Sequence, residues 1–293
     1  MALSRFAASN EVVFPPRVKK LNWITVTVMA VLHIGAVAAL FCFSWRNFWV
    51  SAFLLWVTVG LGISMGYHRL HTHRGYKCPL WLEYFFALCG AMSLEGGPIF
   101  WVGTHRVHHQ KSDMPGDPHS PKEGFFWAHI GWIICGPGNH NNTALMSKYA
   151  PDLAKHRYYR VLNSWHWVPN VILGLILGAI GGYSLVLWGI FLRITVGLHF
   201  TWLINSATHR WGSRRFETTD TSRNIWWVAV LTFGEGWHNN HHAHQASVRH
   251  GLTWKEYDHS WYLVNILKFV GLAWDLKVVS VDTPMPGERR QAA

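Results

Sequence analysis

Three short clusters of histidine are the residues of this chain whose types and spacing could do chemistry. The clusters read His68-Arg-Leu-His71-Thr-His73, His105-Arg-Val-His108-His109 and His238-Asn-Asn-His241-His242. In the second and third clusters the histidines stand at i, i+3 and i+4, so three imidazoles lie on one face of a helix. Imidazole nitrogen is a common ligand of transition metals. The spacing therefore predicts that each cluster is a local chelate for a metal ion.

The number of imidazoles indicates how many metal ions they can hold. The clusters offer about eight, more than the four ligands that one tetrahedral zinc ion takes, so two ions that share the set are the natural count. His68 and His73 are five residues apart and cannot share a face of an unbroken α-helix, so we expect the helix to end or bend between them. The other histidines are interpreted as membrane-edge anchors or satisfied polar groups: His33, His129, His140, His156, His166 and His199.

Two other kinds of metal centre fit the sequence less well. A carboxylate-rich di-iron bundle needs two Glu-x-x-His motifs on facing helices, and the chain offers only Glu235-Gly-Trp-His238. The 4 cysteines are scattered and form no Cys-x-x-Cys pair, which argues against an iron–sulfur cluster. Two irons held by nitrogen beside a lipid phase suggest dioxygen chemistry on a hydrocarbon chain.

The composition places these clusters in a lipid environment. Charged residues make up only 14% of the chain, where an ordinary soluble domain has roughly a quarter. Apolar residues make up 50%, and 19 residues are tryptophan, which is typical of membrane proteins. The basic residues gather beside apolar runs, so the net charge of +11 indicates a membrane surface rather than a nucleic-acid partner.

Apolar segments of the required length predict how the chain crosses the membrane. The predicted spans form two hairpins, over residues 21–43, 47–67, 165–182 and 184–204. The second hairpin is expected to reverse at Gly181-Gly182-Tyr183-Ser184. Residues 79–103 are also apolar, but Glu83 and Glu95 interrupt them, so they are interpreted as re-entrant or interfacial.

Four crossings place both termini and the polar segments 68–164 and 205–280 on one side. Arg46 is the only basic residue in the turns on the other side, so the polar side is predicted to be cytoplasmic. The segment before Leu21 has no signal-peptide pattern and is interpreted as a retained cytoplasmic terminus. The predicted fold is a single all-α integral membrane unit over residues 1–293, with four transmembrane helices capped by a cytosolic helical domain that holds the histidine site.

Four motifs resemble the integral-membrane fatty acyl desaturases of the stearoyl-CoA desaturase and cyanobacterial Δ9 type. They are GYHRLHTHRGY, GGPIFWVGTHRVHHQKSDMPGDPHS, TWLINSATHRWG and FGEGWHNNHHAHQASVRHGL. The resemblance extends from about Leu21 to Asp275, with the motifs in the family's order and at its spacing. It implies a di-iron enzyme that uses O2 and two electrons to introduce a cis double bond at Δ9 into a long saturated acyl chain.

The resemblance also implies a ligand set. Its members are nine histidines and a water held by an asparagine, here Asn205; the histidines are His68, His73, His105, His108, His109, His209, His238, His241 and His242. His71 falls at a position that is not a ligand in relatives. Asp113, Asp117, Glu235 and His119 are candidates either to hold the outer nitrogen of metal-bound imidazoles or to cap loops. No separate catalytic side chain is expected beside the metal centre.

The substrate contacts and partners follow from the same resemblance. Trp101, Thr201 and Trp202 match residues that line the bend of the acyl tunnel, with Glu95 where a glutamine usually stands. Gly103-Thr104 replaces a charged pair that holds coenzyme A in the animal enzymes, so acyl-CoA and a glycerolipid are both plausible substrates. Electrons would come from an external donor such as ferredoxin or cytochrome b5. The uncharged pair is more similar to the bacterial and cyanobacterial branch of the family, which implies a bacterial inner or thylakoid-like membrane.

Two alternatives stay open at this point. A membrane hydroxylase or ketolase shares three histidine boxes and differs in placing oxygen on carbon. A metal transporter also has membrane histidines, but its ligands should lie near the middle of the spans. The sequence assigns no partner to Arg193, which lies inside the fourth predicted span.

Overall fold

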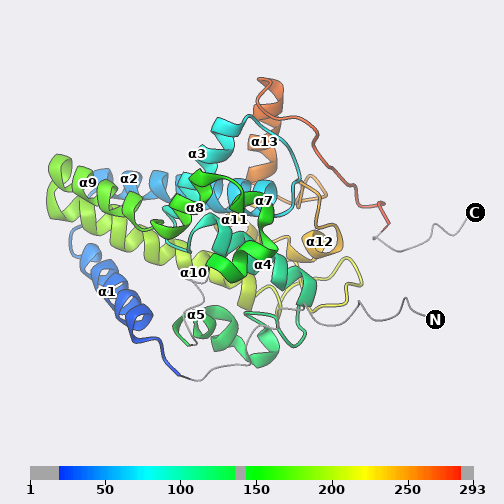
Figure 1. Ribbon diagram of the computed structural model, residues 1–293, viewed down its shortest axis with the longest axis horizontal. Coiled ribbons are helices and arrows are strands. Elements are labelled where there is room, and N and C mark those ends of the chain that lie inside the picture. The colour runs from blue at the N-terminus through cyan, green and yellow to red at the C-terminus, as the bar shows by residue number, and fades with distance from the viewer. Residues whose placement is uncertain (1–19, 136–142, 285–293) are drawn as a thin grey trace, which may run out of the picture.

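The computed structural model describes residues 20–135 and 143–284, which form helices joined by loops (Figure 1). No strand forms within these ranges; only isolated bridges occur, such as that between Leu21 and Cys135. The helices are α1 (Trp23–Leu40), α2 (Trp45–Leu55), η1 (Trp56–Thr72), α3 (Leu80–Ala91), α4 (Pro98–Lys111), η2 (Pro121–Glu123), η3 (Trp127–Gly131), α5 (Trp132–Ile134), α6 (Thr143–Tyr149), α7 (Pro151–Ala154), α8 (Arg157–Ser164), α9 (Val168–Val186), η5 (Leu187–Leu192), α10 (Arg193–Ser206), α11 (Trp226–Leu231), α12 (His238–Ala243) and α13 (His259–Phe269). The predicted all-helical class is confirmed. Residues 1–19 of the predicted cytoplasmic terminus, and His140, lie outside the described residues.

Among the described residues, three helices are long and apolar enough to cross a membrane: Trp23–Leu40, Trp45–Thr72 and Val168–Ser206. The third is bent at Gly182, whose φ of 68° and ψ of −167° suit a residue without a Cβ. Its two arms pack together in antiparallel fashion, since Gly174 lies against Ile190 and Gly178 against Val186 (Figure 1). Helix α3 has only 12 residues and is too short to span, in agreement with the interpretation of residues 79–103.

The helix that carries the first histidine cluster corrects one expectation. Helix η1 is a π-helix that runs unbroken to Thr72, so it neither ends nor bends between His68 and His73. The amide of His73 donates to the carbonyl of His68 at 3.2 Å, an i to i+5 hydrogen bond. Because a π-helix repeats after more residues than an α-helix, side chains five apart lie on the same face. The α-helical period was the wrong one to apply here.

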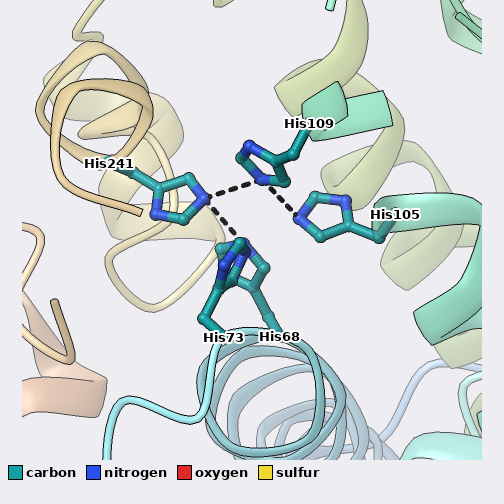
Figure 2. A group of neighbouring side chains, drawn as sticks. All are labelled: His68, His73, His105, His109 and His241. Carbon is teal, nitrogen blue, oxygen red and sulfur yellow. Dashed lines mark hydrogen bonds between the residues drawn. The ribbon is translucent and has the colours of Figure 1, made fainter. Parts of the chain in front are cut away.

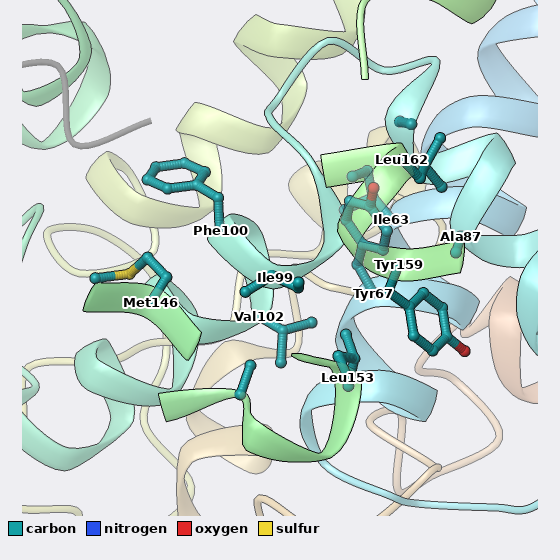
Figure 3. Close-up of a cluster of buried hydrophobic side chains, with 12 residues drawn as sticks. Ile63, Tyr67, Ala87, Ile99, Phe100, Val102, Met146, Leu153, Tyr159 and Leu162 are labelled. Atoms are coloured by element: carbon teal, nitrogen blue, oxygen red, sulfur yellow. The ribbon is translucent and has the colours of Figure 1, made fainter. Parts of the chain in front are cut away.

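A buried apolar cluster holds η1 against the helix that carries the second histidine cluster. Figure 3 shows Ile63 and Tyr67 of η1 meeting Ile99, Phe100 and Val102 of α4, with further side chains from α3, α6, α7 and α8. Eight of the twelve residues in this cluster are 0% exposed: Tyr67, Ala87, Ala91, Ile99, Val102, Met146, Ala150 and Leu153. This packing fixes the distance between the first two histidine clusters, because close-packed interiors resist small displacements.

The structure supplies a partner set for Arg193, which is 1% exposed. Its guanidinium donates to the carbonyl oxygen of Gly189 at 3.0 Å, to the side-chain oxygen of Asn170 at 2.8 Å and to the carbonyl oxygen of Met92. No carboxylate is among these partners. Arg193 therefore ties α10 to α9 and to the end of α3 through neutral acceptors, which satisfies its donors inside an apolar helix pair.

Candidate metal centre

Five histidines from three helices form the first group of the centre. Figure 2 shows His68 and His73 rising together from η1, His105 and His109 from α4, and His241 from α12. One ring nitrogen of each lies within 4.8 Å of the others. The Nε2 atom of His241 is 3.1 Å from that of His68 and 3.0 Å from that of His109. These nitrogens converge on one point, as the spacing of the clusters predicted.

Four further histidines form the second group: His108, His209, His238 and His242. The Nε2 atoms of His209 and His238 are 3.1 Å apart. Neighbouring residues of a helix point about 100° apart, so His108 joins this group while His109 joins the first. The same holds for His242 and His241 on α12. Helices α4 and α12 thus lie between two groups and contribute to both.

Helix α10 positions both Asn205 and His209. His209 follows the end of α10 and reaches the second group, so the structure brings together all nine predicted histidines. Asn205, one turn earlier on α10, lines the adjacent pocket together with His238. His71 faces away from both groups, because its ring nitrogens contact the carbonyl of Gly66 at 2.9 Å and the hydroxyl of Tyr159 at 3.1 Å.

Carboxylates lie beside the outer nitrogens of several of the nine histidines. The Nδ1 atom of His108 is 3.0 Å from Asp117, and that of His209 is 3.4 Å from Asp113. The Nδ1 atom of His68 is 2.7 Å from Glu235. These three carboxylates were sequence candidates for this position. The fourth candidate, His119, instead lies against His108, with ring centroids 4.3 Å apart and ring planes at 35°.

Sequence reasoning missed a fourth carboxylate, Asp220. Asp220 accepts a hydrogen bond from Nδ1 of His242 at 2.6 Å. It lies in a loop 22 residues before the histidine in the chain. The sequence contains no spacing signal for this pair, because the loop is brought to α12 only by folding. Asp220 completes a pattern in which an acidic side chain stands behind one histidine of the first group and three of the second.

The donor atoms of the two groups suit transition-metal ions. Where a carboxylate holds Nδ1–H, the Nε2 atom presents a lone pair to the centre of its group. The Nε2 atoms of His73, His108 and His242 are buried and have no hydrogen-bond partner among the described residues. Lone pairs that converge repel one another unless a cation lies between them. The residues present therefore fit two metal ions.

Burial also keeps several of the histidines in the neutral form that binds metal. Desolvation, assisted by the charge of neighbouring imidazoles, holds the pKa well below its ordinary value in five of them, His73, His105, His109, His238 and His241. Metal ligation requires the neutral imidazole. These side chains are therefore neutral at neutral pH and need not release a proton to bind a metal.

We expect Asp220→Asn to weaken metal binding. The amide cannot accept from His242 with the strength of a carboxylate, and loss of such an outer partner costs about 10-fold to 100-fold in metal affinity. A chelator titration that follows the metal retained would measure the change. Asp275→Asn is the matched control, because Asp275 pairs with Lys77 at the surface. If both variants lost the metal at the same chelator concentration, Asp220 would have no role in holding it.

A buried ion network supports the first group from behind. Arg69, which is 0% exposed, donates from Nε to Glu235 at 2.9 Å and lies 2.8 Å from Asp258 through Nη1. The Nδ1 atom of His250 is 3.0 Å from the same Glu235. Neither Arg69 nor His250 stood out from the sequence as a site residue. The network fixes Glu235, and Glu235 in turn positions His68.

An apolar pocket of about 360 Å³ adjoins the two histidine groups. The structure brings the four predicted substrate contacts together in its wall: Glu95, Trp101, Thr201 and Trp202. Glu95 accepts from the indole N–H of Trp101 at 3.0 Å and from the hydroxyl of Thr201 at 2.8 Å. Both carboxyl oxygens are therefore occupied as acceptors. Burial raises the pKa of Glu95 to about 7, although these two hydrogen bonds act in the opposite direction.

We expect an apolar substrate of this pocket to bind less well as Glu95 ionises. Above pH 7 the carboxylate places a charge in an apolar wall, so the apparent KM should rise by up to about tenfold by pH 8, one unit above the pKa. Glu95→Gln cannot ionise and should hold KM constant over this range. The exposed Glu217→Gln is the control and should follow the unaltered chain. If KM rose equally in Glu95→Gln, the rise would come from the ionisation of a residue other than Glu95.

Fold and site together define a helical protein with helices long and apolar enough to cross a membrane and two buried histidine groups beside an apolar pocket. A family model described as fatty acid desaturase matches residues 44–265. The chain belongs to the fatty acid desaturase family.

Individual relatives cover most of the chain. An sn-1 stearoyl-lipid 9-desaturase of Anabaena variabilis is 48% identical over 88% of this chain and 95% of its own length. An sn-2 palmitoyl-lipid 9-desaturase of Nostoc sp. is 43% identical over 89% and 91%. An acyl-CoA C20 Delta5-desaturase of Anemone leveillei is 42% identical over 92% and 89%. The relatives therefore include enzymes named for lipid-linked substrates and enzymes named for acyl-CoA.

Proposed function

We propose that the chain is a Δ9-type fatty acyl desaturase that introduces a cis double bond into a saturated long-chain acyl group. The observation that carries the proposal is the contact between an apolar pocket and two groups of converging imidazoles, since His68, His105 and His238 belong to the groups and also line the pocket. A metal transporter would not need an apolar pocket at its metal site. The named relatives favour desaturation over hydroxylation or ketone formation.

Two iron ions would be held by the nine histidines. The first would take His68, His73, His105, His109 and His241; the second would take His108, His209, His238, His242 and a water held by Asn205. When bound, the irons would supply the chemistry that couples O2 to C–H oxidation. In the overall reaction the acyl chain loses two hydrogens, an external donor provides two electrons, two protons are taken up, and O2 becomes two waters.

The chain's own side chains would position the substrate. Trp101, Thr201 and Trp202 would form the wall of the bend, and Glu95 fixes Trp101 relative to Thr201 through its two hydrogen bonds. A held bend would present one pair of methylenes to the metal centre and withhold the others. The same apolar wall would keep bulk water from the reacting carbons.

We further propose that the chain crosses the membrane four times as one unit over residues 1–293, with the reversal of the second hairpin at Gly182. The guanidinium of Arg46, in the first hairpin, lies against Gly181, so both turns meet at one end of the molecule. Segments 68–164 and 205–280 would form the cytosolic cap at the other end, which gives cytoplasmic termini in a bacterial inner or thylakoid-like membrane.

The electron donor would dock on the cytosolic cap. Exposed basic residues are available on and beside η2, α6 and α8: Lys122, Lys148, Lys155, Arg157 and Arg160. A small acidic donor such as ferredoxin, or cytochrome b5, would be attracted by this surface.

Expression in a host that makes no unsaturated fatty acids tests the proposed function. Gas chromatography with double-bond localisation should find a new cis double bond at C9. A hydroxy or keto acid instead would establish the hydroxylase or ketolase alternative. Iron-loaded protein that forms no product with a reduced donor and saturated acyl substrates present would contradict the proposal.

A further inference from the structure

The pocket beside the histidine groups reaches the outer surface of α1. Its lining includes histidines of both groups and also Ile24, Thr25 and Val28 on the first turns of α1. Ile24 is 80% exposed and Val28 42% exposed. Helix α1 is one of the three candidate membrane helices. At α1 the pocket therefore opens beside apolar side chains that a bilayer would cover.

Exposed tryptophans locate this opening along the membrane normal. Trp23, at the start of α1, is 69% exposed, and Trp165 and Trp167, just before α9, are 56% and 45% exposed. Trp167 also lines the pocket. Tryptophan is enriched at the level of the lipid head groups, and Lys20 lies exposed immediately before α1. The opening thus lies at the boundary between head groups and acyl chains.

Charge in the pocket wall bears on the substrate's carrier. Coenzyme A carries several phosphates, which proteins grip with arginine and lysine. Among the described residues that line the pocket there is no arginine and no lysine. His166 stands in the wall near the opening, but burial lowers its pKa, so it is neutral at neutral pH. The described wall can therefore hold an apolar acyl chain, but it has no cationic side chain that could bind a phosphate group.

The rim of the opening is held in place on both sides. The amide of Asn22 donates to the carbonyl of Ile134 at 2.8 Å, which ties the start of α1 to the end of α5. Deeper along α1, Met29 packs with Leu198 and Trp202 of α10. Trp132 and Ile133 of α5 also line the pocket. The opening is therefore a built feature between α1 and α5.

We propose that the acyl chain enters sideways from the bilayer between α1 and α5, and that the substrate is the acyl chain of a membrane glycerolipid rather than acyl-CoA. The head group stays at the interface beside Lys20 and Trp167, while the chain extends past Trp101 to the metal centre. This inference rests on the proposed desaturase function and selects one of the two carriers that the relatives leave open.

The test uses the iron-loaded full chain in dioleoyl-phosphatidylcholine vesicles, with reduced ferredoxin as donor. Deuterated stearoyl chains are supplied either as distearoyl-phosphatidylglycerol in the vesicle or as stearoyl-CoA in solution, and the labelled double bond is measured by mass spectrometry. Val28→Trp fills the opening. Val31→Trp is the matched control, because Val31 is also an exposed valine of α1 (50%) but does not line the pocket. Thr25→Trp is a second variant that fills the opening.

We expect the unaltered chain to convert the lipid-linked stearoyl group faster than stearoyl-CoA. Val28→Trp and Thr25→Trp should slow this conversion at least about tenfold, because misplacing the chain is costly in rate, with unchanged iron content. Val31→Trp should match the unaltered chain. Faster conversion of stearoyl-CoA, or equal rates for Val28→Trp and Val31→Trp, would overturn the sideways entry and leave the desaturase function standing. No double bond from either carrier would overturn the proposed function itself, and the sideways entry with it.

Discussion

His108→Ala is expected to abolish double-bond formation and to remove one of two irons. His108 contributes to the second group of histidines only, while its neighbour His109 contributes to the first. Loss of a residue that only hydrogen-bonds to a metal ligand already lowers metal affinity or activity about 10-fold to 100-fold. Loss of the ligand itself should therefore reduce the rate by at least about 100-fold. Iron analysis should fall from about two ions per chain to about one, the number held by the intact first group.

A second histidine provides the control for this prediction. His156 lies outside both groups and contacts the hydroxyl of Tyr84 through Nδ1 at 3.1 Å. His156→Ala should keep both irons and the rate of desaturation. If His108→Ala retained two irons, the second group would not be a metal site. If it lost both, the two groups would bind cooperatively rather than independently.

Arg69→Met is expected to cause the largest loss of stability. Arg69 is fully buried and neutralises two buried carboxylates, Glu235 and Asp258. Methionine preserves most of the volume but leaves both carboxylates without their cation. Breaking a buried ion pair from one side costs about 3–5 kcal/mol. Thermal unfolding of the metal-free protein in detergent would measure this as a fall in Tm on the order of 10 °C.

Arg74→Met separates this effect from a general loss of charge. Arg74 pairs with Asp152, but its side chain is 41% exposed and Asp152 keeps a second partner in Arg106. Pairs of this kind contribute about 0–1 kcal/mol, so the Tm should barely change. If the Tm fell equally in Arg69→Met and Arg74→Met, burial of the Arg69 ion pairs would not make them more stabilising than the exposed pair of Arg74.

Local patterns in the sequence predict the helices and the histidines well. The spacing of His105, His108 and His109 is a property of one helix, and α4 presents it as expected. The apolar segments are also local, and two of the four predicted spans, 21–43 and 47–67, each coincide with a long apolar helix. The other two, 165–182 and 184–204, both fall within the bent helix Val168–Ser206. Gly182 marks the bend, and glycine is the residue that allows it.

Periodicity fails where the helix type differs from the one assumed. An α-helical period predicts a break between His68 and His73, whereas the π-helix η1 places them on one face without a break. The sequence carries no separate signal for a π-helix, because the hydrogen-bond shift from i+4 to i+5 depends on how the helix packs. The packing of η1 against α3 and α4 is such a tertiary constraint.

By itself, the sequence determined that this chain is a helical membrane protein of the desaturase type with three histidine clusters, because these features depend on composition and short-range spacing. The tertiary structure alone decided how the histidines divide into two groups of five and four, which four of them have a carboxylate behind them, and where the pocket opens. Asp220 and His242, or Arg69 and Asp258, are joined by contacts across 22 and 189 residues. Such pairs follow no period in the sequence, since they exist only once separate helices have packed together.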